Sequence, residues 1–522
     1  MAKRDKADAQ RSDEQPEPKQ VSRLSEGVDD TVWRFAKAER ASLIIDAQCY
    51  FSVMQQAMMN ARHRILLIGW DFDTRIHLTE GRRWFEKGRK REQPSRLGSF
   101  IPWLVRHRKT LEIRLLKWSF GIFKFPMRGS MWFDLLRWAP HKRIDFTFDS
   151  AHPTGCSHHQ KIAVLDDRLA VCGGIDMTDG RWDTREHKED DERRKSPRGG
   201  TYTPWHDATM MVEGEVADAL EDIGRDRWIR AGGKALKPHE KRTDSLWPEE
   251  LDVQFENVEI GIARTRAEYR DWNAVTEIEH LFLAHIRRAK RFIYAESQYF
   301  ASRKIAEAMI ARLEEDDPPE IVIVHPENAD GWLEQQVMDH ARAELVRCVR
   351  EADHKNRFSI WCPYVGETPI YVHAKIMIVD DEVLRVGSAN FNNRSMRLDS
   401  ECDLFIDAAR KGNEHAGTVI RDLRWSLLAE HCGVEEDEMP NLLARHGSMA
   451  AMIEHVETDS PRRLQRYHPP ELNTVQKELA RSQALDPEDP DDLLEPFAKG
   501  GIFRKGGRLS RMRKKLSRKN GE

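Results

Sequence analysis

The 522-residue sequence has no long apolar run. No stretch approaches the roughly 18 uninterrupted apolar residues that a membrane-spanning helix needs. The segment from Met1 to Val21 is rich in charged residues and has no apolar core of the kind found in secretory signals. There are only seven cysteines and no Cys-x-x-Cys pair, which favours reduced thiols over a disulfide framework or a cysteine zinc site. We therefore expect a cytoplasmic protein, with any membrane contact peripheral and at the inner face.

The sequence also lacks an excess of charge of either sign. It has 84 Lys and Arg against 88 Asp and Glu, a net charge of -4. This balance gives no argument for a nucleic-acid partner, and we expect none. The length exceeds the usual range of a single domain, so two core domains with tails are expected. The composition does not indicate an oligomeric state.

Hydrophobic periodicity predicts an α/β fold built as two duplicated lobes, each a mixed sheet flanked by helices. Short apolar strands and amphipathic helices follow in the same order in both halves, and a polar stretch from Lys234 to Glu250 separates them. We predict a disordered segment at 1–28, an N-terminal lobe at 29–240 and a C-terminal lobe at 241–435. Residues 436–522 are predicted to hold helical segments, an acidic linker and a basic tail.

Both lobes carry the same residues at the same spacing. In each set a Lys follows a His by two positions, an Asp follows the Lys by five, and a Gly follows the Asp by seven. The sets are His159, Lys161, Asp166 and Gly173 in the first half, and His373, Lys375, Asp380 and Gly387 in the second. A repeat at matched spacing predicts two half-sites that meet between the lobes, whereas a single such His would carry little weight.

Two imidazoles and two ammonium groups suit the cleavage of a phosphodiester. One neutral imidazole can attack phosphorus, a protonated one can supply the leaving alcohol with a proton, and the lysines can hold the phosphate oxygens. Such a site needs neither a metal nor an organic cofactor, and we expect none. Alternation around the second motif places Val372, Ala374, Ile376 and Ile378 on one face of a strand, with His373 and Lys375 on the other.

Carboxylates are expected behind the imidazoles. Asp207 and Glu401 each open an apolar strand downstream of a motif and are our candidates for orienting the rings, with Asp176 as a further supporting residue. Asp166 and Asp380 follow strands at the tips of two hairpins. They belong to the repeated set, and we interpret them as structural support more than as reacting groups.

These residues resemble the phospholipase D superfamily, whose mark is a duplicated His-x-Lys-x4-Asp motif followed by Gly-Ser-x-Asn. The second copy matches throughout with Gly387-Ser388-Ala389-Asn390, whereas the first has Gly173-Gly174-Ile175-Asp176. This form, with Pro204-Trp205-His206-Asp207, is similar to phospholipases D of the eukaryotic type. We expect a bacterial-looking minimal catalytic core without their regulatory lipid-binding modules.

The resemblance implies a phosphohistidine mechanism on a phospholipid substrate. It makes His159 the nucleophile and His373 the general acid and later base, and it assigns contacts with the phosphate oxygens to Lys161, Lys375, Ser388 and Asn390. It implies cleavage of a glycerophospholipid such as phosphatidylcholine, and transfer to other alcohols. A cardiolipin-synthase-like transferase and a nuclease or other phosphodiesterase on the same fold stay open as alternatives.

Three further segments bear on the substrate. The aromatic and basic segment from Trp118 to Trp138 suits either a membrane interface or acyl-chain channel, or a buried helix over the sheet. The basic tail Arg504–Lys519 could attract anionic lipid or stay solvated. The charged run from Glu186 to Arg194 is expected to form a surface loop.

Overall fold

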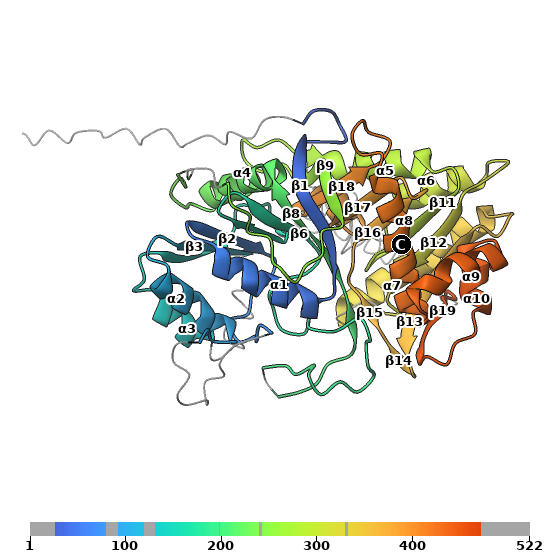
Figure 1. The fold of residues 1–522 in the computed structure, drawn as a ribbon. Helices are drawn as coiled ribbons and strands as arrows, with labels where there is room; N and C mark the ends of the chain where they lie inside the picture. Colours follow the sequence, from blue (N-terminus) through green and yellow to red (C-terminus); the bar gives the residue numbers. More distant parts are fainter. Residues whose placement is uncertain are drawn as a thin grey trace, which may run out of the picture.

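The computed structural model describes residues 27–79, 92–118, 131–197, 199–237, 239, 243–328 and 332–470. Its chain forms two α/β lobes side by side, the first from blue to green and the second from yellow-green to orange (Figure 1). None of the helices it describes is long and apolar enough to cross a bilayer. The predicted tail 504–519 and the acidic linker lie outside the described residues.

The first lobe contains a seven-stranded mixed sheet in the order β4-β3-β2-β5-β6-β8-β1. The pairs β4/β3 and β3/β2 are parallel, and every other neighbouring pair is antiparallel. Its strands are β1 (Arg34–Ile45), β2 (Arg64–Gly69), β3 (Glu112–Trp118), β4 (Ile144–Asp149), β5 (Ile162–Leu165), β6 (Leu169–Gly173) and β8 (Ala208–Gly214).

The second lobe repeats this topology in the order β13-β12-β11-β16-β17-β18-β9. Its strands are β9 (Phe255–Arg266), β11 (Phe292–Glu296), β12 (Glu320–Val324), β13 (Phe358–Val365), β16 (Ile376–Val379), β17 (Val383–Gly387) and β18 (Glu401–Asp407). β1 and β9 then pair antiparallel, so the two sheets join at these edges. The duplicated mixed α/β architecture predicted from the sequence is confirmed.

Short strands complete the sheets. β10 (Val275–Thr276) pairs with β9, and β14 (Thr368–Pro369) and β19 (Arg462–Arg466) both pair with β13. A separate parallel pair joins the lobes through β7 (Trp205–His206) and β15 (Tyr371–Val372). These two segments, far apart in sequence, bring the backbone of the second motif beside that of the first lobe.

Helices cover both sheets and also lie between them. α1 (Ala47–Asn60), α2 (Leu97–His107) and α3 (Met131–Trp138) pack with the outer face of the first sheet, and α5 (Glu277–Arg288), α6 (Arg303–Leu313) and α7 (Trp332–Ala352) with that of the second. The inner faces of both sheets share one central core with α4 (Glu215–Arg230) and α8 (Ala416–Cys432). Strand alternation sorts side chains between these cores: Leu66 and Ile68 lie in the central core, and Ile65 and Leu67 in the outer one.

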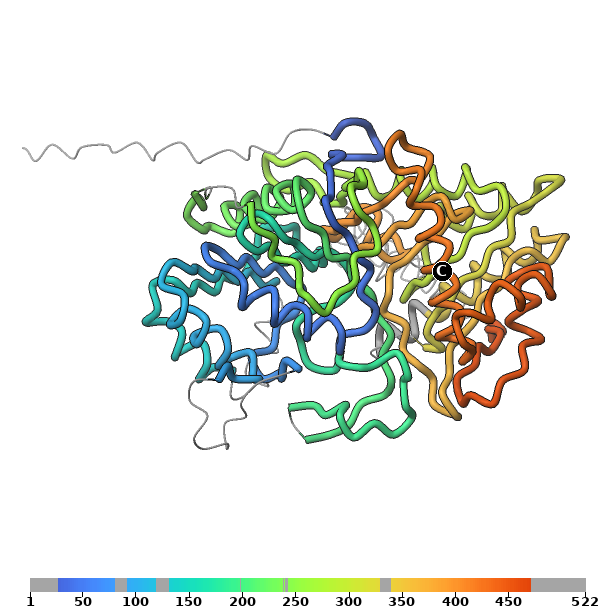
Figure 2. The backbone as a smooth tube through the Cα atoms, in the orientation of Figure 1, coloured from blue at the N-terminus to red at the C-terminus, as the bar shows by residue number. Residues whose placement is uncertain are grey.

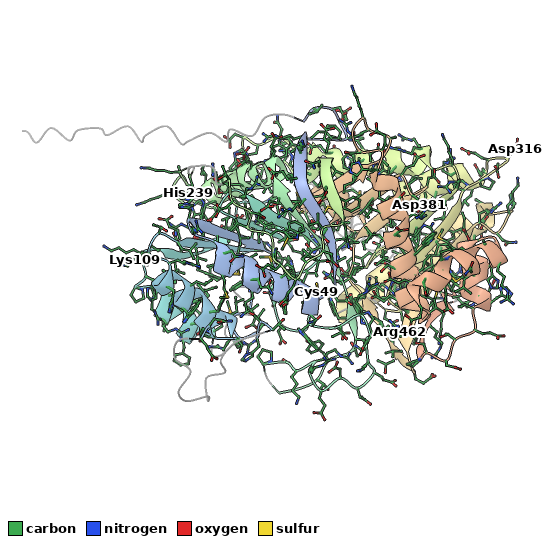
Figure 3. The ribbon with its side chains drawn as sticks, in the orientation of Figure 1. Cys49, Lys109, His239, Asp316, Asp381 and Arg462 are labelled. Carbon is green, nitrogen blue, oxygen red and sulfur yellow. The ribbon has the colours of Figure 1, made fainter. Side chains whose placement is uncertain are left out.

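The chain after α8 packs onto the second lobe, where Figure 2 shows it in red. It forms the short helix η4 (Glu436–Glu438), α9 (Met439–His446) and α10 (Met449–His455), which lie within the part of the chain where helical segments are predicted from the sequence. β19 follows, and Arg462 at its start donates through Nη1 to the carbonyl of Arg185 in the first lobe at 2.7 Å. Figure 3 labels Arg462 at this junction.

Candidate active site

Both motif hairpins turn on a pair of aspartates in the left-handed conformation, with φ of 51° and 56° at Asp166 and Asp167 and of 56° and 58° at Asp380 and Asp381. Aspartate tolerates this conformation because its short side chain can form local hydrogen bonds. The first carboxylate of each pair accepts three backbone N–H groups at 2.7 to 2.8 Å from the start of a neighbouring strand. The structure therefore places Asp166 and Asp380 in support of the hairpins.

The His and Lys residues lie just before the hairpin strands, since β5 begins at Ile162 and β16 at Ile376. The expectation that His373 and Lys375 belong to one continuous strand is wrong at this point. The backbone of each motif is held by the other lobe instead. The N–H of His159 donates to the carbonyl of Ser400 at 2.9 Å, and that of His373 to the carbonyl of His206 at 2.7 Å.

The imidazoles are oriented by carboxylates that cross between the lobes. His159 places Nδ1 at 3.0 and 3.1 Å from the two oxygens of Glu401, which belongs to the second lobe. His373 places Nδ1 at 2.7 Å from Oδ2 of Asp207, which belongs to the first lobe. Both carboxylates are fully buried. Neither half-site is complete within its own lobe, and Nε2 of each ring is left as the nitrogen available for chemistry.

The two carboxylates differ in their surroundings. Glu401 also accepts hydrogen bonds from the hydroxyls of Ser388 at 2.5 Å and Ser395 at 2.7 Å. Asp207 accepts the N–H of Ala208 at 2.8 Å. The hydroxyl of Ser388, predicted to contact phosphate, thus has Glu401 as its partner. Two hydroxyl donors disperse the negative charge of Glu401 more than one backbone donor disperses that of Asp207.

Gly174 stands where the second copy has Ser388, and the structure explains the difference. A Cβ atom at Gly174 would lie 2.1 Å from Oδ1 of Asp207, so a serine cannot fit without displacing that carboxylate. The departure of the first copy from Gly-Ser-x-Asn therefore follows from the position of Asp207. The first half-site has no counterpart of the Ser388 hydroxyl at this position.

The two lysines lie beside the imidazoles. Lys161 donates through Nζ to the carbonyl of His159 at 2.9 Å and lies 3.4 Å from Oδ2 of Asp176. Lys375 donates to Oε1 of Gln298 at 3.2 Å. Asp176 thus supports a lysine and not an imidazole. Asn390 is buried, with no hydrogen-bond partner for Oδ1.

The electrostatics of the site keep both imidazoles neutral. Burial, followed by the lysines, lowers the pKa of His159 and of His373 well below the ordinary value. Burial also lowers the pKa of Lys375 to about 7 and raises that of Glu401 to about 8. The field of Lys161 acts on His373 and that of Lys375 acts on His159, so the four groups of the two half-sites face one another. An anionic phosphodiester that enters between these groups would supply a negative charge to balance the lysines.

Arg181 is a third cation at this site, and our sequence reasoning gave it no role. Its guanidinium lies over the ring of Trp205 at 4.0 Å, and Trp205 lies 5.2 Å from the ring of His373 and stacks on Tyr371. The positive charge of Arg181 contributes to the lowered pKa of His373. Its position five residues after Asp176, beside the motif, was the available indication in the sequence.

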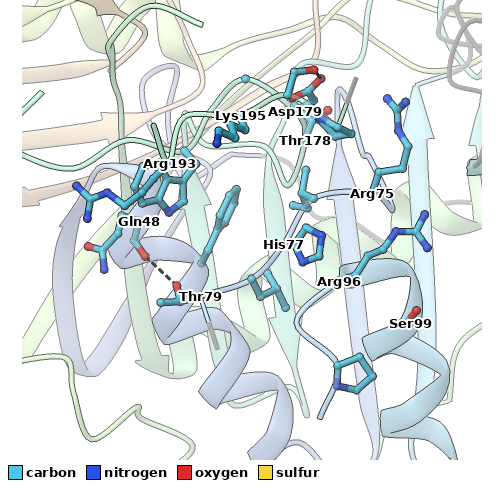
Figure 4. A pocket seen from close by; sticks show the side chains of 18 of the residues that line it. Gln48, Arg75, His77, Thr79, Arg96, Ser99, Thr178, Asp179, Arg193 and Lys195 are labelled. Atoms are coloured by element: carbon cyan, nitrogen blue, oxygen red, sulfur yellow. Dashed lines mark hydrogen bonds between the residues drawn. The ribbon is translucent and has the colours of Figure 1, made fainter. Parts of the chain in front are cut away.

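A cavity of about 1320 Å³ opens in the first lobe next to this segment. Its wall includes Thr178, Asp179 and Gly180, which immediately precede Arg181 in the chain. Figure 4 shows the cavity with Arg75 and Arg96 among its labelled residues. The other residues lining it come from α1, α2, α3, the segments 75–79 and 94–96, Trp182 and the 192–202 segment.

A buried ionic cluster lies behind His373. His187 Nε2 is 3.0 Å and His206 Nδ1 is 2.9 Å from Oε1 of Glu430, and Asp46 lies 3.4 to 3.5 Å from the same two nitrogens. The other ring nitrogen of His187 contacts Asp183 at 3.0 Å. This cluster corrects the expectation that 186–194 forms only a surface loop, because His187 is fully buried there.

The ligand atoms of Asp46, His187, His206 and Glu430 all lie within 4.8 Å of one another, so this set could hold a divalent cation. Protons bound to the histidines can balance the carboxylate charges in place of a cation. Burial alone would lower the pKa of His187, but the surrounding carboxylates outweigh it and raise that pKa to about 9. The cluster contacts the site through the carbonyl of His206, which accepts the N–H of His373, and through Asp46, which accepts the N–H of Asp207.

Two His/Lys half-sites, joined by crossed carboxylates on a duplicated α/β fold, are the arrangement of a phosphodiesterase-type enzyme. A family model described as Phospholipase D matches residues 136–308 and 365–481, and the chain belongs to this family. A model described as Cardiolipin synthase, PLD-like domain, matches residues 282–422.

Curated relatives agree with this membership. Phospholipase D alpha 1 of Nicotiana tabacum is 24% identical over 79% of this chain and 68% of its own length, and that of Carica papaya 25% identical over 75% and 64%. The match to the Zea mays protein spans 51% of that relative. A phosphatidylserine synthase from Haemophilus influenzae aligns with a TM-score of 0.49 and 12% identity, covering 80% of this chain and 95% of its own.

Proposed function

We propose that the protein is a phospholipase D that hydrolyses glycerophospholipids such as phosphatidylcholine to phosphatidate and the free head-group alcohol. The observation that carries the proposal is the crossed pair of imidazole–carboxylate contacts, with Lys161 and Lys375 beside them. The curated relatives named phospholipase D alpha 1 support the choice of a phospholipid as substrate.

In the first step, Nε2 of neutral His159 attacks phosphorus, and the bond from phosphorus to the head-group oxygen breaks. The leaving oxygen takes a proton from Nε2 of His373, so the head group departs as an alcohol and His159 carries the phosphatidyl group. In the second step, His373 removes a proton from water, and the water oxygen attacks phosphorus as the bond from phosphorus to Nε2 of His159 breaks. Phosphatidate leaves and His159 is again neutral. Lys161, Lys375 and Arg181 supply positive charge to the phosphate oxygens, and the side-chain N–H of Asn390 donates a hydrogen bond to them.

The assignment of the two roles rests on the carboxylates. The charge of Glu401 is dispersed over two serine hydroxyls, so it stabilises an imidazolium less and favours an uncharged His159, as a nucleophile requires. Asp207 makes the shorter contact, 2.7 Å, and has fewer competing donors, so it stabilises an imidazolium at His373 better. The substrate's negative charge then raises the pKa of His373 enough for it to act as the acid.

Transfer of the phosphatidyl group to an alcohol in place of water follows from the same intermediate. The match to the cardiolipin synthase model favours a second candidate, a phosphatidyltransferase that uses phosphatidylglycerol as the acceptor. Both activities use the same four groups and differ only in the acceptor that reaches the phosphatidyl-histidine.

The test incubates the purified full chain with labelled phosphatidylcholine, phosphatidylglycerol or single-stranded DNA, with and without ethanol. We expect phosphatidate from phosphatidylcholine, and phosphatidylethanol when ethanol is present. His159→Ala and His373→Ala should each abolish turnover, whereas His354→Ala, at an exposed position away from the site, should retain it. Cleavage of DNA alone would refute the proposal, and cardiolipin as the main product would select the second candidate.

A further inference from the structure

The helix α3 presents an apolar face to solvent. Trp132 is 48%, Phe133 74% and Leu136 66% exposed. The opposite face of the helix is anchored by Met131 and Trp138, which are buried. Among the residues that the structure describes, Val28 is the one other large apolar side chain that is classed as exposed. Three of four such side chains therefore gather on one eight-residue helix.

This gathering calls for a physical reason. Scattered exposed apolar residues are ordinary, but a contiguous patch on a helix of a water-facing protein marks an interaction surface. Positions 132 and 136 are four apart and 133 and 136 three apart, so the three side chains lie on one face. Tryptophan and phenylalanine beside leucine are the side chains that a helix lying in a lipid interface buries between the head groups and the acyl chains.

The surroundings of α3 carry positive charge. Arg137, on the same helix, is 43% exposed. The cavity beside α3 is lined by five Lys or Arg residues against three Asp or Glu residues. The basic residues are Arg75, Arg96, Arg137, Arg193 and Lys195, and the acidic ones Asp134, Asp179 and Glu192. Arg75 and Arg193 pair with Asp73 and Asp191, which lie outside this lining, but Arg96 and Arg137 share the one carboxylate of Asp134. Positive charge beside the apolar face therefore complements a surface of anionic lipid head groups.

The position of α3 connects this face to the active site. The cavity is lined by Phe133 and Arg137 of α3 together with Asp179 and Gly180, which are next to Arg181 in the chain. A lipid surface that contacts α3 would therefore lie at the cavity that borders the catalytic segment. Figure 1 shows α3 next to α2 at the periphery of the first lobe.

We propose that α3 is a membrane-docking element whose Trp132, Phe133 and Leu136 insert into the surface of an anionic phospholipid bilayer. The inference rests on the proposed phospholipid substrate and adds how that substrate is reached. For the helical part of the segment from Trp118 to Trp138, the proposal combines the two interpretations given above. One face of the helix is buried, and the other contacts the membrane interface. Residues 119–130 of that segment lie outside the described residues.

The first experiment measures binding without catalysis. The full chain is sedimented with vesicles of phosphatidylcholine alone or mixed with phosphatidylglycerol, as native protein, as the double variant Trp132→Gln/Leu136→Gln, and as Val28→Gln. We expect binding to the anionic vesicles, about tenfold weaker in the double variant and unchanged in Val28→Gln. Circular dichroism checks that the variant is folded. Native protein that fails to sediment with anionic vesicles, or a folded double variant that binds as well as native protein, would overturn the proposal.

The second experiment separates docking from chemistry. Neither Trp132 nor Leu136 lines the cavity, so hydrolysis of a short-chain phosphatidylcholine below its micelle concentration should be the same in the double variant and in native protein. Hydrolysis of vesicles should fall in proportion to the lost binding. Equal losses on both substrates would refute docking. If native protein hydrolyses neither substrate but the variant still loses vesicle binding, docking stands and the proposed function fails.

Discussion

Replacement of the two crossed carboxylates should separate the roles of the histidines. In Glu401→Gln the amide keeps the size of the side chain, but one of the two atoms facing Nδ1 of His159 becomes a donor. The ring then shifts toward the tautomer with its proton on Nε2, which cannot attack phosphorus. Asp207→Asn makes the same change at His373, where the contact is 2.7 Å. In catalytic triads the equivalent loss costs about 10⁴-fold in kcat, and we expect about 10³-fold or more at either position.

The assay compares two leaving groups. Phosphatidyl-p-nitrophenol releases a phenolate that needs little help from an acid, whereas phosphatidylcholine releases an alcohol that needs a proton. If His159 is the nucleophile, Glu401→Gln should slow both substrates equally. If His373 is the acid, Asp207→Asn should slow phosphatidylcholine at least about tenfold more than the nitrophenyl ester. Asp407→Asn, on the same strand β18 but paired with Arg288 near the surface, is the control and should keep activity.

The opposite pattern, with Glu401→Gln selective for the alcohol leaving group, would assign the acid to His159 and refute the argument from the serine hydroxyls. Full activity in both variants would refute the crossed orientation itself.

Three other substitutions test separate parts of the site. Gly174→Ala places a Cβ 2.1 Å from Oδ1 of Asp207 and should abolish activity in a folded protein, measured as turnover beside circular dichroism. Arg181→Gln should lower kcat/KM about 100-fold, with Arg181→Lys intermediate, as removal of one charge donor to the transition state predicts. Asp149→Asn should destabilise the fold by about 3 to 5 kcal/mol in urea unfolding, because it leaves the buried Arg227 without its 2.8 Å partner.

The Asp149 prediction also has a pH dependence. Burial would raise the pKa of this carboxyl, but Arg227 and then His158 hold it below its usual range. Its contribution to stability should therefore be present above the unfolded pKa of about 3.9 and be lost as the pH falls through the folded pKa. Equal acid unfolding of native protein and Asp149→Asn would contradict this pH dependence. An active Gly174→Ala would contradict the prediction for Gly174, and an Arg181→Gln with unchanged kcat/KM would contradict the one for Arg181.

The sequence revealed the repeat because the same hairpin, folded twice, imposes the same spacing twice. The aspartate turns show why: a carboxylate that caps the adjoining strand must follow the lysine at a fixed distance in both copies. Asp207 and Glu401 could be found because Glu401 begins a buried strand and Asp207 directly precedes one. That each carboxylate orients the histidine of the other lobe could not be predicted, because the order of residues along the chain does not show how two lobes dock.

Other features depended on contacts between distant residues. Ser388 is at the expected place in its motif, but its hydroxyl is directed to Glu401 by the fold of β17 and β18. His187 lies in a highly charged run and is nevertheless buried, because its partner Glu430 comes from a helix 243 residues further along. Charge alone predicts exposure for such a run, and only the docked lobes supply the compensating partners.

Because each imidazole is oriented by a carboxylate of the other lobe, catalysis requires that the two lobes are docked. If the lobes separate, both rings lose their orienting partner at once, so an open or half-folded molecule cannot retain one working histidine. Each lobe expressed alone should therefore be inert toward lipid, and the two mixed together should recover turnover only to the extent that they reassociate. A phosphodiesterase built in this way is inactive until its two lobes have docked.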